Sequence, residues 1–305
     1  MNQPVSTPLP SSSLSQTKKE KAKTDLSKAM PRRFSSLLLR NLALLCALMA
    51  AGILLVLCGF ILIRGLPALN GDLFAWKSTT ENLSMLPAIF NTLSICFGSL
   101  LISVPCGVGA AIYLQEYARP GSKFTALASL MAETLAGIPS IIFGLFGMLF
   151  FVGSLHLQLS ILSGMLTMAM MVLPFIVRTA QEALVQIPSS MRQASYALGA
   201  GRLHTIVHVL LPQAAGGICS GILLAAGRIV GESAALIYTA GTIARIAVGL
   251  LDPGATLSVH LFKLLNEGLY IREAGAVALV LLIVVCVLNL LQMLLSRTMT
   301  KGWKK

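Results

Sequence analysis

Two charged residues, Arg228 and Glu232, lie in an apolar stretch that is predicted to be a membrane-spanning helix. Because they are four residues apart, they share one helix face and can pair. At about 1.5 Å per residue from Gly216, Arg228 lies about 18 Å along the helix, near or slightly beyond the middle of a bilayer. An arginine at that depth costs about 2.5 to 3.5 kcal/mol on insertion scales, so it must face a partner or a water-filled path.

Two interpretations of these charges remain open. In the first, a salt bridge locks the helix against its neighbours, and removing one partner leaves a buried, unpaired charge. In the second, Arg228 supplies positive potential and several donors to an oxyanion that crosses the bilayer, while Glu232 orients the arginine and limits the strength of binding. Glu133 is a further acid in an apolar stretch. It either pairs with an arginine or a polar group of a partner subunit or lies in a wet cytoplasmic vestibule, and we favour the vestibule.

No catalytic or metal-binding motif accompanies these charges. His204 and His208 are one helical turn apart, but no His-Glu-x-x-His motif contains them, and the six cysteines lie in apolar stretches without Cys-x-x-Cys spacing. We therefore expect no metal site, no disulfide framework and no catalytic residue. The chain also has no Gly-x4-Gly-Lys-[Ser/Thr] stretch, so any ATP and Mg²⁺ belong to another polypeptide.

Membrane spans are the elements that must position the charged pair. Of the 305 residues, 56% are apolar and 11% are charged, and the mean hydropathy is +0.83. Soluble domains carry about 25% charged residues, so a soluble globular protein is excluded. The pattern predicts an all-α, polytopic membrane protein, because six apolar stretches are long enough to cross a hydrocarbon layer of about 30 Å. The six predicted transmembrane helices lie near 41 to 63, 87 to 113, 125 to 153, 159 to 177, 213 to 235 and 274 to 296.

The distribution of positive charge predicts the orientation. Of the 23 lysines and arginines, 17 fall on one side of the membrane and five on the other, leaving Arg228 inside a span. Because cytoplasmic segments carry this excess, both termini and the loop from Arg178 to Pro212 are predicted to be cytoplasmic. The net charge of +12 lies at the membrane edges without aromatic residues among it, so we expect no nucleic-acid binding.

The pattern divides the chain into four parts. Residues 1–36 are predicted to be a disordered basic cytoplasmic tail, residues 37–80 the first transmembrane helix with an external loop, residues 81–297 a domain with five further transmembrane helices, and residues 298–305 a basic cytoplasmic C-terminus.

Prolines and glycines are predicted to interrupt three spans, at Pro105, at Gly137-Ile138-Pro139 and at Pro174. Small residues such as Gly144 and Gly147 favour close packing of membrane helices, whereas the breaks themselves favour a role in shaping a pathway. Both interpretations remain open.

A leucine stripe marks the stretch from 239 to 273, which contains no full span. We expect an external amphipathic or re-entrant helix there. The stripe consists of Leu257, Leu261, Leu264 and Leu265.

The loop from Arg178 to Pro212 is predicted to contain two short helices. Ile187-Pro188-Ser189-Ser190 is typical of a helix start, and Gly199-Ala200-Gly201 of a helix end followed by a reversal. An apolar face follows, which either docks into a groove of another protein or packs on its own bundle. That face is formed by Leu203, Ile206, Val207, Leu210 and Leu211.

The spacing within this loop resembles the EAA loop of ABC importer permeases, whose pattern is Glu-Ala-Ala-x3-Gly-x9-Ile-x-Leu-Pro. The matching residues are Gln193, Ala194, Ser195, Gly199, Val209, Leu211 and Pro212. The sequence departs from this pattern at two positions, with Gln193 in place of the leading glutamate and Ser195 in place of the second alanine. The resemblance implies the type I ABC importer permease fold. It also implies that residues 179–212 form coupling helices that sit in a cleft of a cytoplasmic ATPase.

Further segments between roughly 80 and 297 resemble the PstA family of phosphate importer permease subunits. The resemblance implies a transmembrane permease subunit of an ATP-driven, binding-protein-dependent importer that carries inorganic phosphate across the bacterial inner membrane. It places Arg228 and Glu232 in the substrate path. The alternative is a type I permease for another oxyanion, such as sulfate or molybdate. The segments are 136–140, 143–147, 228–233, 256–260 and 266–268.

The same resemblance implies the partners. We expect a second, non-identical permease subunit (PstC-like), a dimeric cytoplasmic ATPase (PstB-like), a periplasmic or lipid-anchored phosphate-binding protein (PstS-like) and membrane lipid. No cofactor is expected on this chain itself.

Overall fold

The computed structural model describes residues 39–75, 84–119, 122–268 and 270–301. The predicted tail at 1–36 lies outside these residues, as do the last four residues of the chain. Within the described ranges the chain is helical and contains no strand. Residues 1–60 and residues 61–305 form two units, which are described separately.

The first predicted span is a helix over Leu39–Ala68, whose last three residues form a 3-10 turn. Apolar side chains such as Leu48, Ile53 and Val56 are exposed along it. A helix that is apolar all round and unshielded by its own chain is suited to a lipid or protein environment within a membrane.

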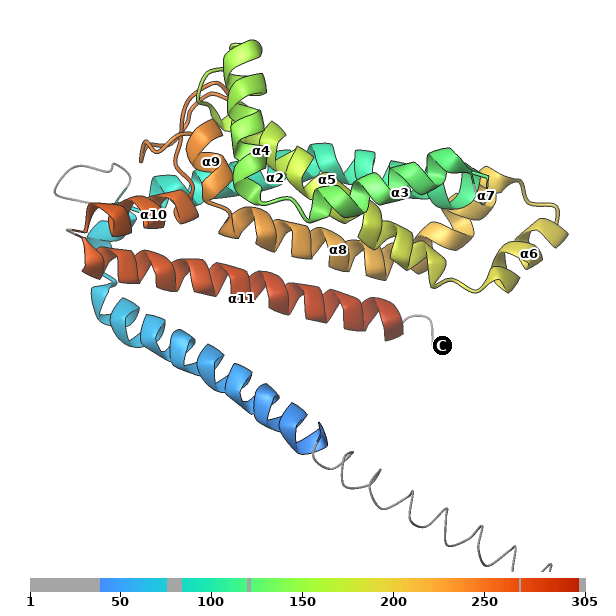
Figure 1. The fold of residues 1–305 in the computed structure, drawn as a ribbon, viewed down its shortest axis with the longest axis horizontal. Helices are drawn as coiled ribbons and strands as arrows, with labels where there is room; N and C mark the ends of the chain where they lie inside the picture. The colour runs from blue at the N-terminus through green and yellow to red at the C-terminus, as the bar shows by residue number, and fades with distance from the viewer. Residues whose placement is uncertain (1–38, 76–83, 120–121, 269, 302–305) are drawn as a thin grey trace, which may run out of the picture. The chain divides into compact units, whose positions relative to one another are not determined.

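The second unit is a bundle of long and short helices (Figure 1). Its elements after the short 3-10 turns at Leu66–Ala68 and Gly71–Phe74 are α2 (Leu86–Ile112), η3 (Tyr113–Tyr117), α3 (Lys123–Ala136), α4 (Ser140–Gly147), η4 (Met148–Ser154), α5 (Ile161–Val185), α6 (Ser189–Ala197), α7 (Arg202–Thr205), η5 (Ile206–Leu210), α8 (Leu211–Gly231), α9 (Ala234–Thr239), α10 (Leu257–Glu267) and α11 (Ile271–Lys301). The segments η3, η4 and η5 are π-helical extensions of their neighbours.

Helix α5 lies at the centre of the bundle. It packs against α2 on one side and α8 on another, and α11 packs against α8. Met168, Met171, Val172 and Ile176 of α5 are buried among side chains from α2, α4, α8 and α9. The part of α5 from Ile161 to Val177 is largely apolar, because most of its surface is buried in the bundle. Its last turns carry Arg178 and Glu182, which are half-exposed or more.

Five helices are long and apolar enough to cross a membrane, or six if the bent pair of α3 with α4 and η4 forms one span. The bend of 100° follows Gly137-Ile138-Pro139, where the prediction of a break is confirmed. Predictions of breaks at Pro105 and Pro174 are wrong, since α2 and α5 run through both prolines. Pro174 is buried, and a membrane helix tolerates the lost hydrogen bond where neighbouring helices enclose it, whereas Pro105 is exposed.

Close packing holds the bent segment against α9. A Cβ atom added to Gly144 would meet Ala235 Cα at 2.6 Å, and one added to Gly147 would meet Thr239 Cγ2 at 2.8 Å and also contact Thr167. The small residues of α4 therefore allow helix backbones to approach, as the packing interpretation predicts.

The predicted leucine-striped helix is α10, which begins after Thr256 and ends at Gly268. Leu257 and Leu264 are buried, Leu261 is half-buried and Leu265 is exposed, so the stripe faces the bundle along one side only.

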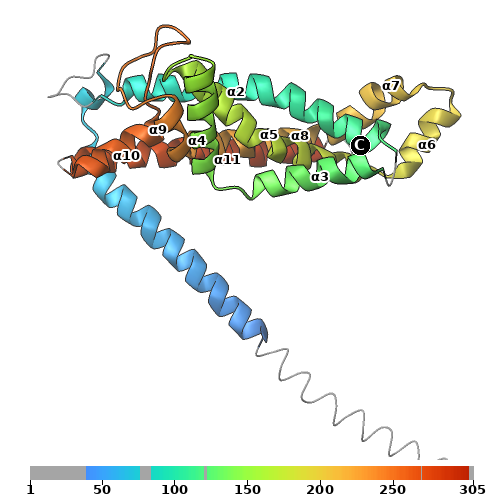
Figure 2. The same cartoon turned by 45° about the horizontal axis from the view of Figure 1, so that its top comes forward.

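Asn91 of α2 fastens the segment that precedes α10. Its Nδ2 donates to the carbonyls of Arg245 (2.9 Å) and Ala255 (3.1 Å), and its Oδ1 accepts from the Ala247 N–H (3.2 Å). Within residues 61–305, α9 and α10 lie at one end of the bundle, and α6 and α7 lie at the other (Figures 1 and 2).

Candidate functional site

Arg228 and Glu232 do not lie on one helix. Helix α8 ends at Gly231, and Glu232 adopts extended backbone angles (φ −80°, ψ 128°) before α9 begins at Ala234. The predicted fifth span of 213 to 235 is therefore wrong at its end, and with it the shared helix face. The local sequence contains no proline at this break, but Gly231 and the basic Arg228 in the last turn are typical of a helix end, and the predicted span overlooks this signal.

Glu232 is held by the elements beyond the break. Its side-chain Oε1 accepts a long hydrogen bond from the Ala235 N–H (3.4 Å) at the start of α9. Its backbone carbonyl accepts from Ser258 Oγ of α10 (2.5 Å). Glu232 thus joins the ends of α8, α9 and α10, where a carboxylate also favours the positive end of a helix.

Arg228 occupies the last turn of α8 and is half-buried. Within the described part of the chain, no ion pair or side-chain hydrogen bond joins it to Glu232 or to any other residue. The predicted salt bridge between the two is not formed. A guanidinium with five donors and no acceptor among the described residues, placed beside a break in an apolar helix, is chemically suited to an anionic ligand.

Glu133 meets an arginine of its own chain. Arg178 Nη1 lies 3.3 Å from Glu133 Oε1, and Arg178 Nε lies 3.1 Å from Glu182 Oε1. These side chains are half-exposed or more. The ion pair joins α3 to α5 across 45 residues of sequence, a distance over which spacing carries no signal.

The predicted loop from Arg178 to Pro212 is largely helical. Helix α5 continues to Val185, beyond the predicted end of the fourth span, and a continuous helical run begins at Arg202 and ends at Gly231. Helix α6 lies between them and begins directly after Pro188, as the sequence predicts.

Gly199 ends α6 by adopting a left-handed backbone with φ of +82°. The Gly199 N–H donates to the Tyr196 carbonyl (3.0 Å), and the Ala200 N–H donates to the Ser195 carbonyl (3.1 Å). This pair of bonds is a Schellman motif, which strongly prefers glycine at the left-handed position. The requirement for Gly199 in the loop pattern follows from this turn.

The remaining residues of the pattern divide between the surface and the interior. Gln193 and Ala194 are exposed on α6, while Ser195 is buried and its hydroxyl contacts Thr205 Oγ1 at 2.8 Å. Serine in place of the second alanine therefore links α6 to α7. Leu211 is half-buried in the first turn of α8, and Pro212 follows just after the π-helical segment η5 within the continuous helical run.

The apolar face after the turn at Gly199 is partly buried against the bundle and partly exposed. Ile206 and Leu210 are buried against α5 and α8 residues such as Leu184 and Ala214. Leu203 and Val207, in contrast, are exposed. One side of the helical run packs on its own bundle, and the other remains available to another protein.

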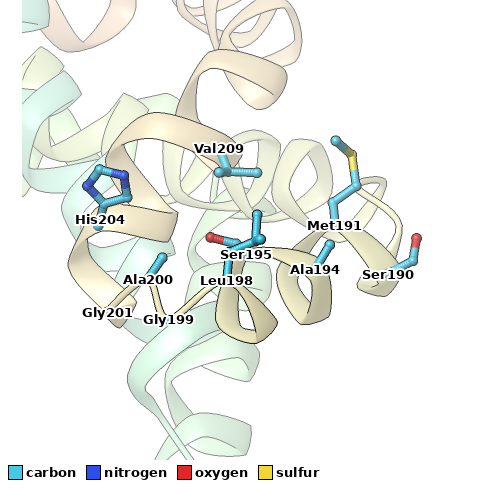
Figure 3. A pocket seen from close by; sticks show the side chains of 10 residues that line it. All are labelled: Ser190, Met191, Ala194, Ser195, Leu198, Gly199, Ala200, Gly201, His204 and Val209. Carbon is cyan, nitrogen blue, oxygen red and sulfur yellow. The ribbon is translucent and has the colours of Figure 1, made fainter.

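An open hollow of about 950 Å³ lies between α6 and the run that follows it (Figure 3). Its walls come from small residues of the turn and from Leu198, which is 89% exposed. The lining residues are Ser190, Met191, Ala194, Ser195, Leu198, Gly199, Ala200, Gly201, His204 and Val209. In the described residues, no group of three or more His, Cys, Asp or Glu side chains is arranged to hold a metal ion.

Solved structures with a similar fold are permease chains of ABC importers. One is the methionine ABC transporter MetNI in an inward-facing conformation (TM-score 0.58, 21% identity, 73% of this chain and 99% of that chain). Another is a bacterial alginate ABC transporter in complex with a pentasaccharide-bound periplasmic protein (TM-score 0.56, 17% identity, 83% and 95%). The predicted type I importer permease fold is confirmed.

Sequence comparisons agree with the fold. The chain is 35% identical over 280 residues to the probable ABC transporter permease protein YqgI of Bacillus subtilis, covering 86% of this chain and 95% of that protein. It is 33% identical over 229 residues to the phosphate transport system permease protein PstA of Haemophilus influenzae, covering 73% and 80%. These matches confirm the resemblance to PstA proteins. The model of the family described as "Binding-protein-dependent transport system inner membrane component" matches residues 103–304. The chain therefore belongs to this family of multi-pass inner membrane transport components.

Proposed function

We propose that this chain is the permease subunit of a phosphate importer and that Arg228 lies in the substrate path. The names of the PstA relatives support phosphate as the substrate class. The observation that carries the role of Arg228 is its half-buried guanidinium, which has no acceptor in the part of the chain that the structure describes and lies beside the break between α8 and α9. A discontinuous membrane helix is a common place for an anion site in transporters.

In this proposal, Glu232 limits how strongly an anion binds at Arg228. The carboxylate lies one turn beyond Arg228 in sequence but is engaged with the start of α9. It lowers the positive potential around the arginine without neutralising it through an ion pair. An anion therefore binds strongly enough to enter and weakly enough to leave.

The coupling loop is the contact with a PstB-like ATPase in this proposal. Gln193, Leu198 and Leu203 are exposed at the end of the bundle opposite α10, which supports a docking role. ATP and Mg²⁺ bind to the ATPase. A PstC-like subunit completes the pore, and a PstS-like protein delivers phosphate on the side of α9 and α10.

Uptake of labelled phosphate tests the assignment, with sulfate as the competing anion. The chain is expressed with its operon partners in a bacterium that lacks phosphate transport, as wild type, Arg228→Ala and Arg119→Ala. Arg119 is an exposed arginine beyond η3 and serves as the matched loss of one charge. We expect wild type and Arg119→Ala to import phosphate, and Arg228→Ala to fall about tenfold or more, a loss of about 1.4 kcal/mol or more.

Membrane levels and assembly of each complex are measured in parallel. Wild type that imports sulfate, or neither anion, contradicts the phosphate assignment. Normal uptake by the assembled Arg228→Ala complex contradicts the role of the arginine. Loss of assembly only in Arg228→Ala favours a structural role for this charge.

A further inference from the structure

Arg192 of α6 points into the protein, although it directly precedes the exposed Gln193. Its Nη2 lies 2.9 Å from Glu116 Oε1, and its Nε donates to the same oxygen at 3.0 Å. Glu116 belongs to η3, the π-helical end of α2. The pair therefore joins α6 to a membrane span from which it is separated by 76 residues of sequence.

The same guanidinium holds the end of a second span. Arg192 Nη2 donates to the Leu184 carbonyl (3.0 Å), and Nη1 donates to the Ile187 carbonyl (3.2 Å). Carbonyls at the end of a helix lack intrahelical partners, and the end of α5 is at Val185. The planar arginine fork satisfies them while it also pairs with Glu116.

Burial distinguishes this pair from the other ion pairs between described residues. The Arg192 and Glu116 side chains are 19% and 6% exposed, whereas both partners of each other pair are more than 40% exposed. An exposed pair is worth little, but a buried pair with further hydrogen bonds holds one geometry and is costly to break. Its inward direction also removes Arg192 from the surface that a partner protein would contact.

We propose that Arg192 is a positioning residue that transmits motion from the coupling helix α6 to α2 and α5. The inference rests on the proposed contact of the loop with an ATPase. Short non-helical segments, 186–188 and 198–201, connect α6 to its chain neighbours. Helix α6 is far from α2 along the chain, so only side-chain contacts can connect the two directly. The clamp formed by Arg192, Glu116 and the two carbonyls makes α6, η3 and the end of α5 move together.

The clamp is tested with reconstituted transporter complexes to which the phosphate-loaded binding protein is added. The complete transporter, with its ATPase and its second permease subunit, is placed in proteoliposomes, and ATP hydrolysis and phosphate import are measured together. The variants are Arg192→Gln, Arg192→Lys and Glu116→Gln, with Arg119→Gln as the matched loss of charge. We expect Arg192→Gln to retain copurification with the ATPase and the KM for ATP. Phosphate imported per ATP is expected to fall about fivefold or more.

Two variants that keep part of the clamp are expected to give intermediate ratios of phosphate imported per ATP. Arg192→Lys keeps the charge but lacks the planar fork, so it restores only part of the coupling. Glu116→Gln keeps the carbonyl contacts but loses the ion pair, and we expect an intermediate ratio. Arg119→Gln should couple like wild type. Wild-type coupling in Arg192→Gln overturns the clamp, as does equal loss in Arg119→Gln.

If the Arg192→Gln complex fails to assemble, a covalent cross-link in place of the Arg192–Glu116 ion pair tests the clamp instead. Glu116→Cys and Arg192→Cys are combined in a background without the six native cysteines and bridged by a flexible bismaleimide. Coupling restored by the bridge supports the clamp, and a bridged complex that stays uncoupled overturns it. A wild-type complex whose ATP hydrolysis does not respond to the phosphate-loaded binding protein would instead reject the proposed function itself.

Discussion

Arg178, Arg192 and Arg228 carry the same charge but meet different surroundings in the fold. Arg178 is half-exposed between two carboxylates, and Arg192 is mostly buried against Glu116. Arg228 has no acceptor among the described residues. The differences follow from position, because Arg178 lies two turns before the end of α5, Arg192 lies within the short α6 and Arg228 lies in the last turn of α8. The same side chain is thus compatible with a surface ion pair at Arg178, with the proposed clamp at Arg192 and with the proposed anion contact at Arg228.

His260 of α10 is a second kind of isolated polar side chain. It is 2% exposed, and both ring nitrogens lack hydrogen-bond partners in the described part of the chain. Burial, followed by the Lys263 charge, lowers the pKa of His260 from its ordinary value of 6.5 to about 4 against the opposing effect of Glu267. The native state therefore favours the neutral ring.

Stability is expected to depend on pH through His260. Because its pKa is lower in the folded state, the unfolded chain binds the extra proton first as the pH falls. Stability is then fully present above pH 6.5 and declines as the pH falls towards about 4, by on the order of 3 kcal/mol. Thermal unfolding of the purified protein between pH 7.5 and 4.5 measures this slope.

A matched substitution identifies the source of the slope. His260→Leu should flatten it, whereas His208→Gln, at an exposed histidine, should leave it unchanged. A His260→Leu protein with the wild-type slope would assign the pH dependence to other groups.

At the scale of elements, two broken helices meet. The bend before α4 and the break before α9 bring these short helices into contact, with Gly144 beside Ala235. The breaks therefore both permit close packing and shape the region beside Arg228. The two interpretations of the prolines and glycines are compatible, because a pathway wall also has to be packed.

Gly144→Ala is expected to destabilise the protein by about 1 to 3 kcal/mol, as overpacking does. The added methyl group meets the backbone of Ala235 at 2.6 Å, which no rotamer change relieves. Gly109→Ala in α2 is the matched control, since no atom lies within 4 Å of its added Cβ. Thermal unfolding of the purified variants compares the two, and equal stability would show that the α4–α9 contact yields easily.

At the scale of the whole molecule, the fold places two kinds of surface at opposite ends of the unit of residues 61–305. The predicted coupling loop (residues 179–212) lies at one end, and the segment around 241–256 leads into α10 at the other (Figure 2). The positive charges favour a cytoplasmic position for the coupling loop. Both termini are then predicted to be cytoplasmic.

Single cysteines test this orientation. Leu198→Cys and Val248→Cys occupy side chains that are 89% and 95% exposed, and each is introduced into a background without the native cysteines. A membrane-impermeant maleimide added to intact spheroplasts should label only Val248→Cys. Labelling of Leu198→Cys alone would invert the topology, whereas disrupted membranes should allow both to react.

The spans, one helix start and one turn of this protein can be predicted from local sequence alone. Apolar length predicts the spans, because a bilayer of about 30 Å imposes a minimum run of residues whatever their packing. The helix starting after Pro188 and the turn at Gly199 also follow from local backbone chemistry. The spacing of residues 193–212 predicts a coupling segment through its resemblance to the EAA loop, and the comparisons confirm the family.

Other features depend on residues that meet only after folding. The end of α8 at Gly231 carries no proline, and contacts of Glu232 with α9 and α10 accompany it. The Arg192–Glu116 clamp crosses 76 residues, so no periodicity reveals it. Local composition sets where a helix is possible, but side-chain partners far along the chain set where it stops and which charges are left free. Arg228 is such a charge because the backbone turns at Glu232, four residues later.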